Sequence, residues 1–325
     1  MTTATTVPVT MDMDGAELDA EDAWHTVRRH GVRSLLHQSF QRFRFGDGFT
    51  NSRALALQMA LSVVPFLLAL TGLAAGIDDG RLADVTAGTV TALTPGSGNA
   101  DVLGRAIDAH DGETVSGEDA GEVALAFGLA FAILSMVTAM AQIERGANRI
   151  YGIRRDRPAL HKYGRAAVLT LVLAVPVGLG FLLLVAGGPF GGSARATYGW
   201  STSQETWWDV LRWPVGLALT TFTISVLLDH APRRRQPALS WLALGASLSV
   251  LITMLASGLL AAYVHYSASF GSVYGPLAGV MALLLWCYLS AIALFAGTAV
   301  AAQLEALRAG LLTPVLEDPG PATTE

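Results

Sequence analysis

The stretch ALSWLALGASLSVLITMLASGLLAAYV, residues 238–264, decides the class of fold. It contains no Asp, Glu, Lys or Arg, and the charge-free run around it extends from Arg235 to Glu305. A helix crosses the ~30 Å hydrocarbon core of a bilayer with about 20 apolar residues. The whole chain agrees with a membrane location, because 52% of its 325 residues are hydrophobic and only 14% are charged. Soluble domains usually carry about a quarter charged residues.

Six stretches are long and apolar enough to span a membrane, so the sequence predicts an all-α, polytopic membrane protein with six transmembrane helices. They are residues 54–75, 123–141, 166–184, 210–228, 238–264 and 273–304. The fourth is the weakest, because Arg212 lies near its start, where a long side chain extends to the headgroups. Trp207, Trp208 and Trp213 form an aromatic belt at that level. The sixth is longer than a bilayer requires, so we expect it to tilt or to project into the cytoplasm.

Basic residues predict the orientation of these spans. Of the 21 Lys and Arg residues, 17 fall in segments that are cytoplasmic if the N-terminus is inside. Only Arg81, Arg105, Arg195 and Arg212 fall in the external segments. Because cytoplasmic segments of membrane proteins carry an excess of Lys and Arg, we expect both termini on the cytoplasmic side.

Segments outside the spans complete the predicted organisation of a membrane domain over residues 51–308. Residues 1–22 and 309–325 are expected to be disordered tails. Residues 23–50 are predicted to form a basic amphipathic helix at the cytoplasmic interface, where arginines meet anionic lipids; a helix packed under the bundle is the alternative. The acidic external loop of residues 77–122 is expected to hold two short amphipathic helices. It is either a lid over a central cavity or a solvated cap.

The sequence contains no motif with catalytic, cofactor-binding or metal-binding spacing. A GxxxxGK[ST] phosphate loop, an HExxH pair and a GxSxG elbow are all missing, and the seven histidines are scattered. The single cysteine, Cys287, rules out an intramolecular disulfide. The net charge of −5 gives no basic field for nucleic acid. We therefore predict a protein that is not an enzyme, needs no cofactor or metal, and has the lipid bilayer as its first partner.

Two carboxylates at span ends are candidate functional residues. Glu144 and Asp229 lie at the cytoplasmic ends of the second and fourth spans, each near arginines. They form either a gating or coupling network at the inner mouth or ordinary interfacial ion pairs, which contribute little when exposed. Because the spans hold almost no other charge, ion-coupled pumping is not expected.

Proline and glycine positions are the next candidates. Pro65 and Pro176 each remove a backbone hydrogen bond inside a span and predict kinks. Gly271, Gly275 and Gly279 recur at four-residue spacing, which favours close helix packing within the chain or in a homo-oligomer.

Three quoted segments carry a resemblance to a known family. ALALQMALSVVPFLLAL contains Ser62 and Pro65, and ERGANRIYGIRR contains Asn148, Arg149 and Tyr151. VYGPLAGVMALLLWCYLSAIALFAG contains Tyr274, Gly275, Trp286, Tyr288 and Gly297. In this order and on these spans, the segments resemble the YihY/virulence factor BrkB family of bacterial inner-membrane proteins, which were once assigned as ribonucleases.

The resemblance implies a multi-pass protein of the bacterial cytoplasmic membrane. It suggests a transporter or a protein that handles lipids or other amphiphiles; a non-transporting envelope scaffold is the alternative. One departure concerns the end of the sixth span, where the family commonly has a Gly-Ala-Glu element followed by Asn. This chain has Gly297-Thr298-Ala299-Val300-Ala301 there. It has therefore either lost the role of that carboxylate or moved the charge. Leu57 and Gln58 also replace the paired tyrosines that are frequent in the first span.

Overall fold

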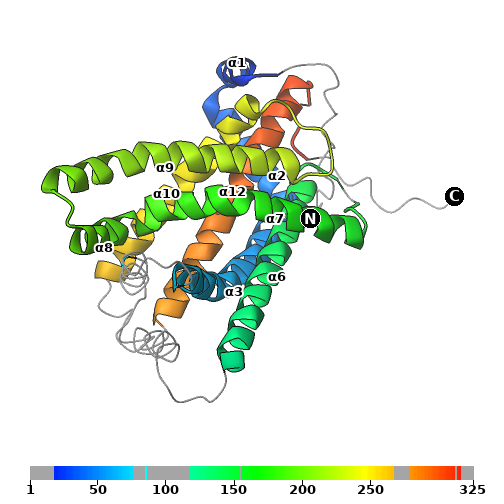
Figure 1. The fold of residues 1–325 in the computed structure, drawn as a ribbon. Coiled ribbons are helices and arrows are strands. Elements are labelled where there is room, and N and C mark those ends of the chain that lie inside the picture. The colour runs from blue at the N-terminus through cyan, green and yellow to red at the C-terminus, as the bar shows by residue number, and fades with distance from the viewer. Residues whose placement is uncertain are drawn as a thin grey trace.

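The computed structural model describes residues 18–75, 85, 118–153, 155–266, 278–311 and 313–315, and these residues form helices and connections without a strand. The helices are α1 (Ala20–His30), α2 (Val32–Phe45), α3 (Gly48–Ala75), α6 (Glu118–Ile150), α7 (Ala159–Phe181), the π-helix η1 (Leu182–Ala186), α8 (Gly187–Tyr198), α9 (Thr202–His230), α10 (Leu239–Tyr266) and α12 (Ala278–Arg308) (Figure 1). The predicted all-α class is confirmed for the described residues.

Four helical segments among the described residues are long and apolar enough to cross a membrane, and they coincide with the third to sixth predicted spans. They are Ala159–Tyr198, Thr202–His230, Leu239–Val264 and Ala278–Arg308. The first two predicted spans fall within α3 and α6, which are helical over these positions. The total of six spans and the orientation remain predictions, and the loop predicted at residues 77–122 lies almost wholly outside the described residues.

The third span is longer than the sequence predicted. It continues from α7 through η1 into α8 and reaches 40 residues. The glycines of the α8 sequence GGPFGGSARATY read as a loop, but side chains of α9 pack directly on that glycine-rich surface. The two arms α7–α8 and α9 form a hairpin that extends away from the other helices (Figure 1).

The N-terminal amphipathic segment is two helices instead of one. Gly31, with φ of 80°, separates α1 from α2, and the side chain of Asp19 caps the start of α1 by accepting from the Glu21 and Asp22 amides. The inner faces of both helices pack against α12, and α1 also contacts α10. Trp24 and Phe40 remain about half exposed on the outer face. The inner faces of α1 and α2 therefore pack against the bundle, as the alternative prediction has it. Contact of their outer face with the membrane remains a prediction.

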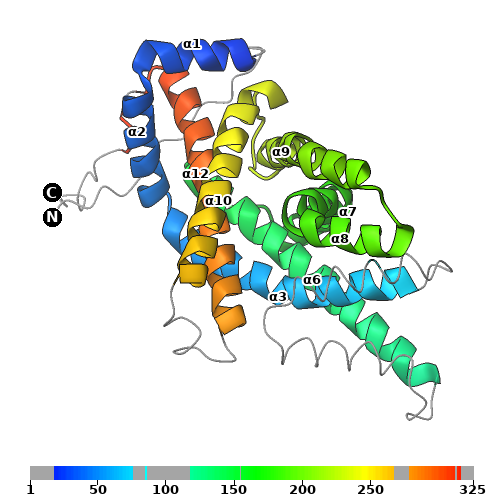
Figure 2. The ribbon, with the colours of Figure 1, turned by 90° about the vertical axis from the view of Figure 1, so that its left-hand side faces the viewer.

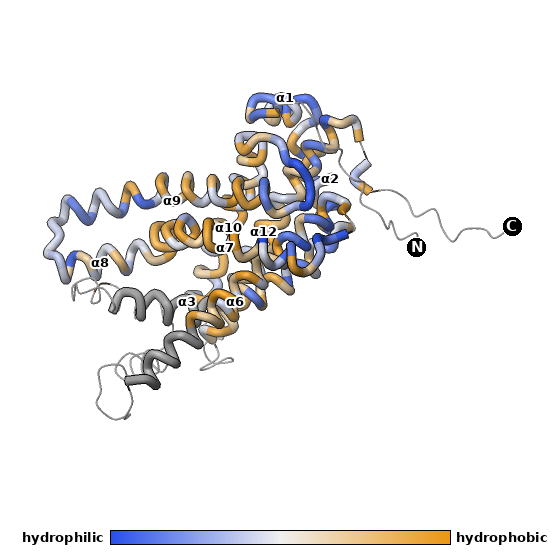
Figure 3. Tube along the Cα trace, turned by 45° about the vertical axis from the view of Figure 1, so that its right-hand side comes forward, coloured by the Kyte–Doolittle hydropathy of each residue, from blue (hydrophilic) through white to orange (hydrophobic). Residues whose placement is uncertain are grey.

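The C-terminal part of α12 lies at the centre of the fold. Every residue from Gly297 to Leu307 is buried, surrounded by α1, α2, α3, α6 and α10 (Figure 2). The extra length of this helix, which we expected to tilt or to project, is thus enclosed by the N-terminal helices. Hydrophilic residues gather around this end and around the far end of the α8–α9 hairpin, whereas the helical stretches between them are mainly hydrophobic (Figure 3).

Small residues bring α10 and α12 together. A Cβ added at Gly245 would lie 2.6 Å from the carbonyl oxygen of Gly297 and 3.0 Å from the Cβ of Ala301. Ser249 lies against Gly297 from the next turn of α10, so each helix contributes two small residues four positions apart. Trp286 extends the same contact by donating from Nε1 to Ser257 Oγ, 3.0 Å away. Gly297 and Trp286 are therefore packing residues of this interface.

The tightness of this crossing gives a testable prediction. Gly245→Ala should lower the free energy of unfolding by about 1–3 kcal/mol, because the new methyl group meets backbone that cannot move aside. The measurement is thermal or denaturant unfolding of the purified protein in detergent.

Gly258→Ala is the matched control, because it lies on the same helix with nothing within 4 Å of an added Cβ. It should be neutral or slightly stabilising. Equal effects of the two substitutions would contradict the close approach at Gly245.

Candidate functional site

Polar side chains that are far apart in the sequence meet at the enclosed end of α12, and we call this cluster the ionic hub. It draws on α2, the end of α6, the segment after α6, the 231–238 connection between α9 and α10, and α12. Its members are Arg42, Glu144, Asn148, Tyr151, Asp156, Arg157, Arg233, Arg234, Gln303 and Glu305. Half of them are almost inaccessible: Arg42, Asn148, Tyr151 and Gln303 are 0% exposed and Glu305 is 1% exposed.

The centre of the hub is an ion pair between Arg234 and Glu305. Their side chains are 5% and 1% exposed. The Arg234 guanidinium carbon also lies 4.9 Å from the centroid of the Tyr151 ring, so the cation is held between a carboxylate and an aromatic face. Taking two charges out of water is costly unless each has its partner in place. The 231–238 connection is therefore held to the end of α12.

Arg42 joins α2 to two other helix ends. Its Nε donates to Gln303 Oε1 at 3.0 Å, and its Nη1 donates to the carbonyl oxygen of Ile150 at 3.1 Å. Gln303 in turn donates to Gln38 Oε1 at 3.2 Å. Burial lowers the pKa of Arg42 to about 10, and burial with the nearby Glu305 charge raises the pKa of the Tyr151 phenol. Arg42 was expected on the basic face of an interfacial helix, but it points into the protein.

Asn148 links the end of α6 to the two neighbouring connections. Its Nδ2 donates to Asp156 Oδ1 at 3.2 Å, and its Oδ1 accepts from the Arg233 amide at 2.8 Å. Asp156 also pairs with Arg145 at 3.4 Å and with Lys162 at 3.5 Å. Burial alone would raise the pKa of Asp156, but the Asn148 hydrogen bond and the two cations outweigh it and hold that pKa below its ordinary value.

Glu144 is buried in the hub, not exposed at an interface. Its carboxylate lies 3.0 Å from Arg157 Nη1, and Arg157 also donates to the carbonyl oxygens of Ala231 and Pro232 at 3.2 and 3.0 Å. Glu144 is thus not part of an exposed interfacial pair, and a gating or coupling role for it stays a prediction. The sequence placed arginines near Glu144, and its ion-pair partner in the structure is Arg157. Arg149 is half-buried at the end of α6.

Asp229 takes a different place from the one we expected. It lies 3.1 Å from His230 Nδ1, with 30% of its side chain exposed. The neighbouring arginines at 233 and 234 bind Asn148, the Asp156 backbone and Glu305. Among the described residues, Asp229 and Glu144 therefore belong to separate ion pairs.

The sequence missed the residues at the centre of the hub. The family pattern led us to expect an acid and an amide in the Gly297–Ala301 stretch. Gln303 and Glu305 instead supply a buried amide and a buried carboxylate a few residues later. Both alternatives for that departure, a lost role and a moved charge, stay predictions. The available clue was that a glutamine and a glutamate follow directly on a long apolar run.

The structure describes the remaining candidate residues only in part. Pro65 lies within α3, whereas Tyr274 and Gly275, like Gly271, lie outside the described residues. Gly279 is in the first turn of α12. The predicted Gly271–Gly279 packing motif is therefore described only at its last member.

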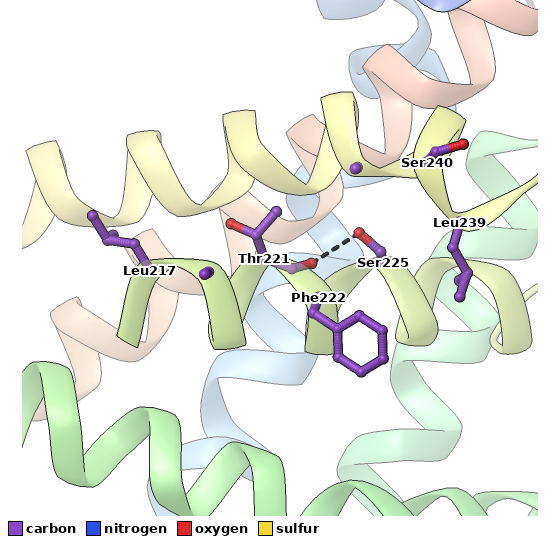
Figure 4. A pocket seen from close by; sticks show the side chains of 8 residues that line it. Leu217, Thr221, Phe222, Ser225, Leu239 and Ser240 are labelled. Atoms are coloured by element: carbon purple, nitrogen blue, oxygen red, sulfur yellow. Dashed lines mark hydrogen bonds between the residues drawn. The ribbon is translucent and has the colours of Figure 1, made fainter. Parts of the chain in front are cut away.

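A groove with a volume of about 420 Å³ lies between α9 and α10, next to the hub. Figure 4 shows Leu217, Thr221 and Phe222 on α9 and Leu239 and Ser240 at the start of the neighbouring α10; Thr221 points towards α10, whereas the Phe222 ring points to the other side of α9. Ala218, Ser225 and Ala243 complete the lining. Ser225 donates to the Thr221 carbonyl at 2.8 Å, so its hydroxyl is satisfied within the helix. The groove is open to the surroundings and mainly apolar, a surface suited to an acyl chain.

Comparisons with known proteins agree on one family. A sequence model of the family described as virulence factor BrkB matches residues 39–314. The ribonuclease-like protein YfkH of Bacillus subtilis is 26% identical over 83% of this chain and 95% of its own length. A UPF0761 membrane protein of Chromohalobacter salexigens is 28% identical over 86% of this chain but only 64% of its own length. No solved structure matches the chain.

The central ion pair predicts strong coupling between two positions 71 residues apart. Glu305→Gln or Arg234→Gln should each cost about 3–5 kcal/mol of unfolding free energy, because each removes one partner of a buried charge. The double substitution should cost less than the sum of the two. Denaturant unfolding in detergent measures all three.

The half-exposed pair of Asp22 with Arg308, at 3.8 Å, is the control. Asp22→Asn should cost less than about 1 kcal/mol. Additive losses at Arg234 and Glu305 would show that the pair is not the centre of the hub.

Asp156 predicts a specific acid sensitivity. A carboxylate with a lowered pKa stabilises the fold above its ordinary value of 3.8 and loses that contribution as pH falls through the lower folded value. The unfolding temperature of Asp156→Asn should therefore fall less steeply than that of the wild type below about pH 4. Asp47→Asn, outside the hub, should follow the wild type. An unchanged acid slope in Asp156→Asn would contradict this role.

Proposed function

Because the chain belongs to the virulence factor BrkB family, we propose that it handles an amphiphile in the bacterial cytoplasmic membrane. The proposed action is export or transbilayer movement of a lipid or another molecule with a polar head and an apolar tail. The groove between α9 and α10 is the observation that carries the proposal. It offers apolar lining at Leu217, Phe222 and Leu239, and hydroxyls at Thr221 and Ser240.

The distribution of charge supports an amphiphile over an inorganic ion. The buried carboxylates Glu144 and Glu305 both lie in the hub, each paired with an arginine. Buried ionisable groups mark ion paths when they line the middle of a span, but these two pairs hold helix ends. In this proposal the hub lies on the cytoplasmic side with both termini, in line with the basic segments around it.

The neighbourhood of the groove adds a polar end to the apolar site. Leu239 and Ser240 begin α10 directly after the 231–238 connection, which carries exposed Arg233 and Arg235. An amphiphile whose apolar tail lies in the groove would place its polar head next to this basic connection. Such an arrangement favours a head with negative charge.

A non-transporting scaffold is the second candidate, and the outer face of the N-terminal helices favours it. Val32, Leu36 and Phe40 recur at four-residue spacing on α2 and are 56%, 45% and 54% exposed. Arg28 lies over the Trp24 ring on α1, 5.1 Å from its centroid. An apolar and basic surface of this kind suits either a lipid surface or another envelope protein.

We also propose that the chain is not a nuclease, although one relative has a ribonuclease-like name. The carboxylates nearest to the arginine cluster around the end of α6, Glu144 and Asp156, are both engaged in ion pairs. RNA cleavage by the purified protein that disappeared in Glu144→Gln, while the protein stayed folded, would overturn this view.

Reconstitution into liposomes tests the proposed transport. Vesicles that contain the protein should move a fluorescent phospholipid between leaflets faster than empty vesicles, measured by chemical reduction of the outer-leaflet probe. Ala218→Trp should slow this movement, because the indole fills the groove.

Leu251→Trp on α10 is the matched control, since this position is 54% exposed and outside the groove. Its rate should equal that of the wild type. Equal rates for protein-containing and empty vesicles, in both lipid-movement and solute-efflux assays, would remove the transport proposal and leave the scaffold.

A further inference from the structure

A second cationic centre lies towards the end of α9 opposite the hub. The side chain of Arg212 is 16% exposed, and its Nε lies 3.3 Å from Asp209 Oδ1. Its guanidinium carbon lies 5.4 Å from the centroid of the Trp213 ring. Asp209 is the only acidic partner of Arg212 among the described residues, and its own side chain is 52% exposed. Among the described residues, neither Nη atom of this guanidinium has a hydrogen-bond acceptor within the fold.

The backbone of α8 fixes the position of this guanidinium. A Cβ added at Gly187 would lie 2.9 Å from Arg212 Cδ and Nη1, and one at Gly188 would lie 3.5 Å from Nη1. Trp208 holds the same surface, because its Nε1 donates to the Gly187 carbonyl oxygen at 2.6 Å. The indole of Trp208 also packs with Phe190, with ring centroids 5.2 Å apart. The glycine-rich sequence of α8 thus forms a cradle for one arginine.

The position of Arg212 along α9 matches the headgroup level of a bilayer. Eighteen residues separate it from His230 at the hub end of the helix, which at a rise of 1.5 Å per residue is about 27 Å. The hydrocarbon core of a bilayer is ~30 Å thick. Trp207 and Trp213 flank Arg212 and are 65% and 40% exposed, as is typical of residues at a membrane–water interface.

We propose that Arg212 binds the phosphate of a phospholipid headgroup in the leaflet opposite the hub. A guanidinium offers paired N–H donors whose geometry matches two phosphate oxygens. Exposed Leu211 and Val215, on the same part of α9, offer apolar surface to the acyl chains. Asp209 competes for the cation and limits the affinity. The proposal requires only that α9 spans the membrane, so it is independent of whether the protein transports a lipid.

Two lipids with the same acyl chains test the site. The full chain in detergent is titrated with dioleoyl phosphatidylglycerol and, separately, with dioleoylglycerol, which lacks the phosphate. Thermal unfolding gives an apparent affinity for each. The wild type should respond to the phospholipid much more strongly than to the diacylglycerol. Arg212→Gln should weaken the apparent affinity for the phospholipid about tenfold or more, the loss expected for charge-assisted hydrogen bonds.

Matched variants separate this site from general electrostatic attraction. Arg195→Gln removes an arginine of α8 that is 52% exposed and paired with Glu205, and it should leave the phospholipid affinity unchanged. Asp209→Asn, at a half-exposed position, removes the competing carboxylate and should raise the affinity.

Three results would overturn the proposal. They are equal phospholipid affinities for the wild type and Arg212→Gln, no gain in Asp209→Asn, and an Arg212-dependent stabilisation by inorganic phosphate as large as that by the phospholipid. The last would assign the site to a soluble anion.

Discussion

A buried ion pair, Arg234 with Glu305, holds together the elements that meet at the enclosed end of α12. Helices on all sides keep Glu305 from water, so its charge needs a cation at that point. The cation comes from the 231–238 connection, and Tyr151 adds its ring from the end of α6. Three segments are thereby fixed relative to one another by one guanidinium. Arg42 and Gln303 add α2 to the same assembly.

Several arginines of this chain bind the carbonyl oxygens at helix C-terminal ends in addition to pairing with acids. Arg42 donates to the carbonyl of Ile150 at the end of α6, and Arg165 donates to the carbonyl of His230 at the end of α9. Arg157 does the same at Ala231. The last carbonyls of a helix have no partner within it and carry partial negative charge, so a cation satisfies both needs. The basic residues that predicted membrane orientation therefore also have a structural role.

The sequence placed the third to sixth predicted spans on long helices of the structure, because a long apolar run has few alternatives to a membrane helix. It underestimated the third span, because the glycines at 187, 188 and 191 resemble a loop until the side chains that lie on them are known. It also missed the hub. Arg42 sits in a basic amphipathic pattern and gives no local sign that it points inward, and no spacing rule connects Arg234 with Glu305. Asn148 and Tyr151 were identified through the family resemblance, but their partners required the fold.

Labelling of a single introduced cysteine tests most directly whether the ion pair keeps the end of α12 enclosed. Cys287 is the only native cysteine and is replaced by Ala, and a water-soluble maleimide is then applied to Ala306→Cys and Ala309→Cys. Residue 306 is buried and residue 309 is exposed, so only the second should react in the folded protein. Adding Glu305→Gln should make position 306 reactive. Equal labelling of the two positions with Glu305 intact, or no change at 306 in Glu305→Gln, would contradict the account.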